Sequence, residues 1–150
     1  MTDDWYEALA ALSAAGARFI VVEAHALAVH GVPRATQDLD VWVEPTRENA
    51  EKVWLALAAF GAPLEELGIT ATDFTRPDAV VQIGLPPDRI DVLTGISGVS
   101  EFAAAWDARV EREVAGSKLP FLGRDTLIEN KRASGRLKDL ADIEALGEKP

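Results

Sequence analysis

The stretch Arg34-Ala35-Thr36-Gln37-Asp38-Leu39-Asp40-Val41-Trp42-Val43 carries two aspartates with one residue between them. Its second half alternates polar and apolar residues, as a β-strand does. Successive strand side chains point to opposite faces, so Leu39 and its alternate apolar neighbours should enter the core, and Asp38 and Asp40 should leave from the other face. The two aspartate Cα atoms would then lie roughly 6–7 Å apart. Carboxylates at this spacing can converge on a hard divalent cation that also binds substrate phosphates, which predicts phosphoryl or nucleotidyl chemistry.

The composition is that of a globular domain that can fold without disulfide bonds. The chain has 150 residues, of which 48% are hydrophobic and 27% charged, and this length suits a single domain with its own core. The absence of cysteine excludes a disulfide framework, a zinc thiolate site and a thiol nucleophile. The acidic start Met1–Asp4 lacks the positive region of a secretory signal, and no apolar run is long enough to span a bilayer. We therefore expect a cytoplasmic protein with no membrane contact.

The charge of the chain is strongly acidic and unevenly distributed. The formal net charge of −10 works against a broad nucleic-acid interface, because a duplex binder needs a basic face. A nucleotide, or an RNA end held by a small basic patch, is compatible with this charge. Basic residues do concentrate near the end of the chain, at Lys131, Arg132, Arg136 and Lys138.

Hydrophobic periodicity and turn residues predict one mixed α/β domain over residues 1–150, with a mixed β-sheet flanked by helices. Helices are expected over 3–15, 24–30, 47–60 and around 100–106, and a helical C-terminal segment from about 124 that Gly135 breaks or bends. Strands are expected over 18–22 and from 38 to Pro45, over 79–85 and 89–93 as a hairpin about Pro86-Pro87-Asp88, and over 109–114. The stretch 62–78 has mixed signals and receives no element.

Asp91 supplies a third acid in the predicted hairpin. It alternates with Ile90 and Val92, so its side chain should face away from the core. If this strand lies beside the strand of Asp38 and Asp40, three carboxylates share one open face. Solvated acids at strand ends give the same local pattern, so the spacing alone leaves both a metal site and a surface edge possible.

Three separated stretches carry a family resemblance. They are Phe19–Val41 (FIVVEAHALAVHGVPRATQDLDV), Pro86–Thr94 (PPDRIDVLT) and Asn130–Ile143 (NKRASGRLKDLADI). Together they resemble the small bacterial nucleotidyltransferases of the polymerase-β-like superfamily, in the branch that includes the AbiEii-type toxins of toxin–antitoxin systems. The resemblance spans nearly the whole chain and implies the nucleotidyltransferase fold.

The resemblance implies a transferase that uses Mg²⁺ or Mn²⁺ to move a nucleoside monophosphate from a nucleoside triphosphate to an acceptor hydroxyl. Asp38, Asp40 and Asp91 match the catalytic, metal-binding acids, and Asp91 would help to deprotonate the acceptor. The nucleotide-binding positions that it implies are Ala24, His25, Arg34, Thr36, Lys131, Lys138 and Asp139. The acceptor stays open among a tRNA end, a protein and a small molecule, and a cognate antitoxin would be a partner if the chain is a toxin.

The two lysines have two interpretations. Lys131 and Lys138 are seven residues apart and would share a face if the helix continued through Gly135. Their ammonium groups would suit a triphosphate as point charges. In the alternative, the basic residues of this segment make solvent-exposed pairs with Glu129, Asp139 and Asp142.

The sequence departs from the family pattern at one place. Many members have Gly-Gly or Gly-Ser where this chain has Glu23-Ala24, so a negative charge stands where a triphosphate would approach. This favours a second hypothesis, a catalytically weak binding protein of the same fold or an antitoxin-like regulator. A metal-dependent hydrolase is a third, although the chain has only 2 histidines for the ligand sets that such enzymes often use.

Overall fold

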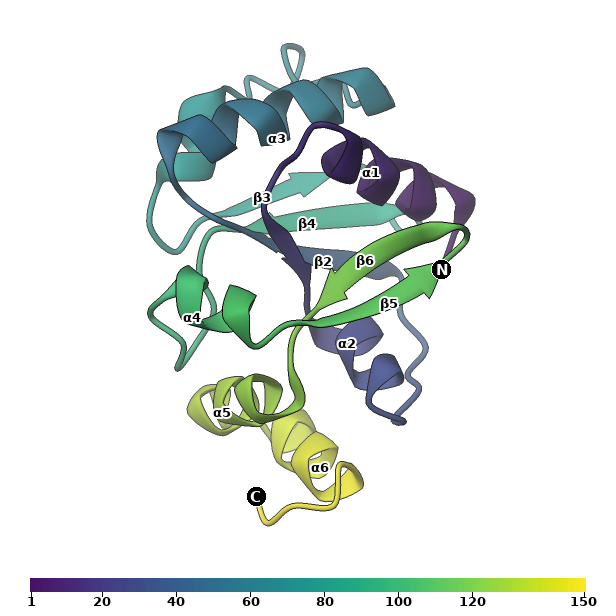
Figure 1. Ribbon diagram of the computed structural model, residues 1–150, viewed down its shortest axis with the longest axis vertical. Coiled ribbons are helices and arrows are strands. Elements are labelled where there is room, and N and C mark those ends of the chain that lie inside the picture. Colours follow the sequence, from purple (N-terminus) through teal and green to yellow (C-terminus); the bar gives the residue numbers. More distant parts are fainter.

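A six-stranded mixed β-sheet runs through the centre of the protein, in a computed structural model that describes residues 1–150 (Figure 1). Its strands are β1 (Phe19–Val21), β2 (Asp38–Val43), β3 (Val80–Ile83), β4 (Arg89–Leu93), β5 (Val110–Val114) and β6 (Ser117–Phe121). Their order across the sheet is β3-β4-β2-β1-β6-β5. β2 runs parallel to β4 and β1 parallel to β6, while the other neighbours are antiparallel.

Helices cover both faces of this sheet. They are α1 (Asp3–Ala14), α2 (Glu23–Val29), α3 (Arg47–Phe60), α4 (Phe102–Asp107), α5 (Arg124–Ser134) and α6 (Leu137–Ala145), with a short 3₁₀ helix at Ala71–Thr75. α1 and α3 pack on one face, and α2, α4, α5 and α6 lie on the other (Figure 1). None of the helices combines the length and the apolar character that crossing a membrane requires.

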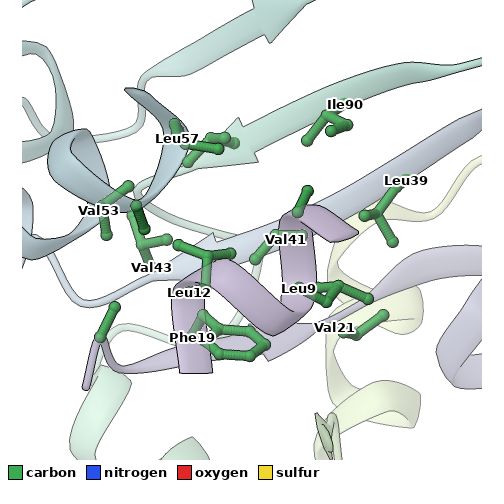
Figure 2. Packing of buried hydrophobic residues seen from close by; sticks show 14 of the residues in the cluster. Leu9, Leu12, Phe19, Val21, Leu39, Val41, Val43, Val53, Leu57 and Ile90 are labelled. Carbon is green, nitrogen blue, oxygen red and sulfur yellow. The ribbon is translucent and has the colours of Figure 1, made fainter. Parts of the chain in front are cut away.

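The alternation in β2 sorts its side chains as expected. Leu39, Val41 and Val43 are fully buried in the cluster that joins the sheet to α1 and α3. Figure 2 shows Leu12 of α1 and Val53 of α3 lying over this row. Burial of each such aliphatic side chain is worth roughly 1.5–3 kcal/mol, so the register of β2 is held firmly.

The opposite face of β2 differs from the expectation of an open, solvated surface. α2, α4, α5 and α6 build a second core there around Trp42, which is 2% exposed. Asp91, expected on an open face, is only 7% exposed, while Asp38 and Asp40 are half-buried. The acids therefore lie in a recess among helices, because apolar side chains of the C-terminal half need this face of the sheet for their own burial.

Several element boundaries were predicted well and others were missed. α3 has the expected bounds, with Thr46 accepting a hydrogen bond from Asn49 N at its start. α5 begins at Arg124 and ends before Gly135, whose left-handed backbone (φ 65°) turns the chain into α6. β6 was not predicted, because Pro120 lacks a ladder donor and is unusual within strands.

Candidate functional site

The three predicted acids come together on β2 and β4. Asp40 and Asp91 are directly opposite each other in the parallel pair, and Asp38 is opposite Arg89. These residues alternate with Leu39 and Ile90, which enter the main core, so their side chains share the other face of the sheet. Two strands separated by 51 residues of sequence, from Asp40 to Asp91, thus meet at one recess.

Arg89 is a member of this group that the sequence interpretation missed. Its Nη2 donates to Asp38 Oδ2 over 2.9 Å, and its Nε lies 3.4 Å from Asp91 Oδ1. The guanidinium therefore bridges two of the acids, and no three acidic or histidine side chains already converge as a metal-ligand set. The signal that could have revealed it is the spacing, because residues two apart in a strand share a face.

Asp40 is the acid without a cationic partner. It forms no ion pair, and its pKa is raised from 3.8 to about 7, chiefly by burial. The negative charges of Glu23, Asp91 and Asp38 contribute to this rise, and the charge of Arg89 opposes it by a smaller amount. Burial also raises the pKa of Asp91 against the opposing effect of Arg89, and its buried Oδ1 accepts no hydrogen bond. The negative charge of the recess therefore exceeds the compensation that Arg89 provides, and a further cation would be bound favourably there.

A buried lysine lies next to the acids. Lys131 is 2% exposed, and its Nζ lies 3.2 Å from Glu23 Oε2, 3.3 Å from Asp139 Oδ1 and 3.1 Å from Asp142 Oδ2. Burial opposes its charge, but Glu23 and Asp142 outweigh this and raise the pKa of Lys131. The alternative of solvent-exposed pairs is therefore wrong for Lys131, whose ammonium group is enclosed by carboxylates.

Two arginines brace the carboxylates around Lys131. Arg34 Nη2 lies 2.7 Å from Asp142 Oδ1, and Arg136 Nε lies 2.7 Å from Asp139 Oδ2. Burial by itself would raise the pKa of Asp139, but the hydrogen bond from Arg136 and the charge of Lys131 bring it down to about 2. Arg34 and Asp139, predicted to bind nucleotide, thus belong to an ion-pair network that joins the turn before β2 to α5 and α6.

Lys138 differs from Lys131 in its surroundings. Gly135 breaks the helical segment, as predicted, so the two lysines do not share one face of a continuous helix. The turn nevertheless brings both to the same cavity of about 300 Å³, together with Glu23, Asp38 and Asp40. Lys138 is exposed and forms no ion pair, so it is the cation of this cavity that is available to a ligand.

The remaining predicted positions divide between lining and positioning roles. Ala24 and Thr36 line the cavity, and Thr36 Oγ1 also donates to Asp38 O and accepts from Asp38 N, which shapes the entry to β2. His25 does not line it. Its Nε2 donates to Asp38 O over 3.2 Å, its ring meets Trp5 edge-on, and burial lowers its pKa. His25 therefore holds α2 against β2.

Glu23 occupies the position where the family resemblance leads one to expect glycine. Its backbone is left-handed, with φ 56°, a conformation that costs an L-residue roughly 1–2 kcal/mol. Its side chain pairs with Lys131, and its negative charge helps to raise the pKa of Asp40. Glu23 therefore interacts with both the acids and the lysine. Glu23 thus combines a backbone conformation that favours glycine with a carboxylate that pairs with Lys131.

Comparison of the chain with protein-family models and with curated proteins gives no match.

Proposed function

We propose that this protein is a Mg²⁺- or Mn²⁺-dependent nucleotidyltransferase with the polymerase-β-like nucleotidyltransferase fold. The observation that carries the proposal is Asp40, a half-buried carboxylate opposite Asp91 with no cation of its own. Buried like charges are unfavourable unless a counter-charge joins them, and a divalent ion supplies it with oxygen ligands alone. Asp38, Asp40 and Asp91 would hold the ion.

The residues present fit such an ion. The donor set is made of carboxylates, which hard cations prefer, and Asp91 Oδ1 has an unsatisfied acceptor position. Arg89 pairs with Asp38 and Asp91 and would be released from them when they take up another ligand. When bound, the divalent ion supplies charge stabilisation for the reacting phosphate and for the leaving pyrophosphate.

The chain's own residues account for the rest of the reaction. Lys138 would pair with the triphosphate, while Ala24 and Thr36 form the wall of its cavity. Asp91, whose pKa burial raises, would accept the proton of the acceptor hydroxyl. The acceptor oxygen forms a bond to the α-phosphorus, and the bond from that phosphorus to the pyrophosphate oxygen breaks as pyrophosphate leaves.

Triphosphate binding tests the proposal directly. Isothermal titration with each of the four common nucleoside triphosphates, in Mg²⁺ and then in Mn²⁺, should reveal saturable binding. Asp40→Asn should abolish it, whereas Asp88→Asn, an exposed acid in the turn before β4, should have no effect. Ligand at 100 times its dissociation constant would also raise the unfolding free energy by about 2.7 kcal/mol. Absence of binding in every combination would refute the proposal.

The second candidate, a catalytically weak binding protein or antitoxin-like regulator of the same fold, is favoured by Glu23. Its carboxylate pairs with Lys131 and adds negative charge beside Asp40, which opposes a triphosphate. If this candidate holds, the wild type binds triphosphate without transferring α-labelled nucleotide, and Glu23→Gly, which suits the left-handed backbone, restores transfer. Transfer by the wild type would exclude it.

As a transferase the chain would act in the cytoplasm, where nucleoside triphosphates are, and it is a candidate toxin with a cognate antitoxin as partner. Expression in a bacterial host should then slow growth, and expression of Asp40→Asn should not. Equal growth of the two cultures would argue against the toxin role and would leave the transferase activity to the binding assay.

A further inference from the structure

A second cavity, of about 910 Å³, lies on the same face of the sheet as the acids. It opens at the carboxyl ends of β2 and β4, where Trp42 and Thr94 form part of its wall. Trp42 follows Asp40 by two residues and Thr94 follows Asp91 by three, so the wall begins roughly 7–10 Å from the acids along the strands. Its volume is that of a small-molecule site.

The paired residues Val80 and Leu93, here called the shelf, lie between this cavity and Asp91 in the register of β3 and β4. On the edge strand β3, Gln82 is opposite Asp91 and Val80 is opposite Leu93, and directly opposite residues of antiparallel strands share a face. Gln82 is exposed, and Val80 is 57% exposed although it is apolar. A molecule in the cavity could therefore lie along Val80 and Leu93 and bring a hydroxyl to Asp91.

The lining of the cavity selects the chemistry of its ligand. None of the lining residues is basic, and Asp78 is the one ionisable side chain among them, with no ion pair of its own. Trp42, Ser97 and Ser100 are among the other lining residues, all of which are uncharged. An RNA end brings phosphates that need cations, which this lining lacks.

We infer that this cavity and the Val80–Leu93 shelf bind the acceptor, and that the acceptor is a small hydroxyl-bearing molecule with a cationic amine. The inference rests on the proposed nucleotidyl transfer and names its acceptor class. The amine pairs with Asp78, and the ring system covers Val80 and Leu93. The hydroxyl oxygen attacks the α-phosphorus, its proton passes to Asp91, and pyrophosphate leaves.

Binding is tested without any triphosphate, by NMR of the Trp42 indole N–H, which is buried and has no hydrogen-bond partner. D-Glucosamine is the probe, and N-acetyl-D-glucosamine, which lacks the charge, is its control. Glucosamine should shift this resonance saturably, and the N-acetyl sugar or the Asp78→Asn variant should bind roughly two- to fivefold more weakly. Asp88→Asn, another exposed acid, is the matched variant and should bind as the wild type does. No saturable shift, equal affinity for the two sugars, or unchanged affinity in Asp78→Asn would overturn the inference.

Transfer of labelled nucleotide to the acceptor provides a second test. With α-labelled triphosphate and Mg²⁺, label should enter glucosamine, and Val80→Trp should prevent this by filling the shelf. Leu55→Trp on α3, where the side chain is 61% exposed, is the matched control. Label that enters tRNA but not glucosamine would overturn the acceptor class while the transferase proposal stands. Glucosamine binding with no triphosphate binding would mean that the proposed function has failed, and the acceptor role with it.

Discussion

Lys131 and Lys138 look equivalent in the sequence but should respond in opposite ways to the same substitution. Lys131→Met keeps the length of the side chain and removes the charge that lies 3.1–3.3 Å from Glu23, Asp139 and Asp142. Breaking a buried ion pair from one side costs about 3–5 kcal/mol, because the remaining charges are left uncompensated. Arg34 and Arg136 still touch two of these acids, so we expect a loss near 3 kcal/mol, toward the lower end of that range.

A stability loss of this size in Lys131→Met can be measured by thermal and by urea unfolding. For a chain of this length 1 kcal/mol corresponds to roughly 2–4 °C, so the melting temperature should fall by about 6–12 °C. Urea unfolding at neutral pH gives the free energy directly. Lys138→Met, at an exposed position with no ion pair, should change stability by less than about 0.5 kcal/mol.

Triphosphate binding should depend on Lys138, the lysine whose removal leaves stability unchanged. Lys138→Met should weaken binding, because it removes the free cation of the cavity, and should leave the fold intact. A loss of less than about 1 kcal/mol in Lys131→Met would contradict this prediction, since it would mean that removing Lys131 leaves no uncompensated acids behind. Equal destabilisation by Lys138→Met and Lys131→Met would contradict it as well.

Three further predictions concern other buried or half-buried polar side chains. Because the pKa of Asp40 is raised from 3.8 to about 7, its proton stabilises the fold below that range and this stability is lost as pH rises through about 7. Asp40→Asn should therefore raise the metal-free melting temperature at about pH 8 but not near pH 4, and equal shifts at both would contradict this. The pKa of Asp139 is lowered to about 2, so Asp139→Asn should be destabilising at neutral pH, and the gap to wild type should close as pH falls through about 2. Denaturant unfolding across the acid range measures that gap, which a structural defect of the variant would leave constant. Asn49, 4% exposed, accepts from Arg18 N and donates to Arg18 O and Glu44 O. Asn49→Ala should cost about 2–4 kcal/mol in urea unfolding, and a loss under about 1 kcal/mol would show that these bonds contribute little.

Local patterns predicted the parts of the fold that local rules control. The alternation of β2 predicted that Leu39, Val41 and Val43 enter the core, and the helix predicted over 47–60 coincides with α3, which Thr46 caps and Gly61 ends. In each case one residue's preference is decided by neighbours within a few positions. The strand β6 was missed because Pro120 contradicts the local pattern, and its pairing with β1 is made across about 100 residues of sequence.

Local sequence patterns predicted only some of the residues of the candidate site. Strand alternation predicted that Asp38, Asp40 and Asp91 leave the core face, and the family resemblance predicted that the three acids form one group. The folded chain places Asp40 opposite Asp91, Arg89 between the acids and Lys131 among three carboxylates, and no local pattern predicts these contacts. Strand alternation is a local property of the backbone, so it can be predicted from neighbouring residues. Charge compensation in a buried recess depends instead on side chains from β2, β4, α2, α5 and α6, which meet only when the chain has folded.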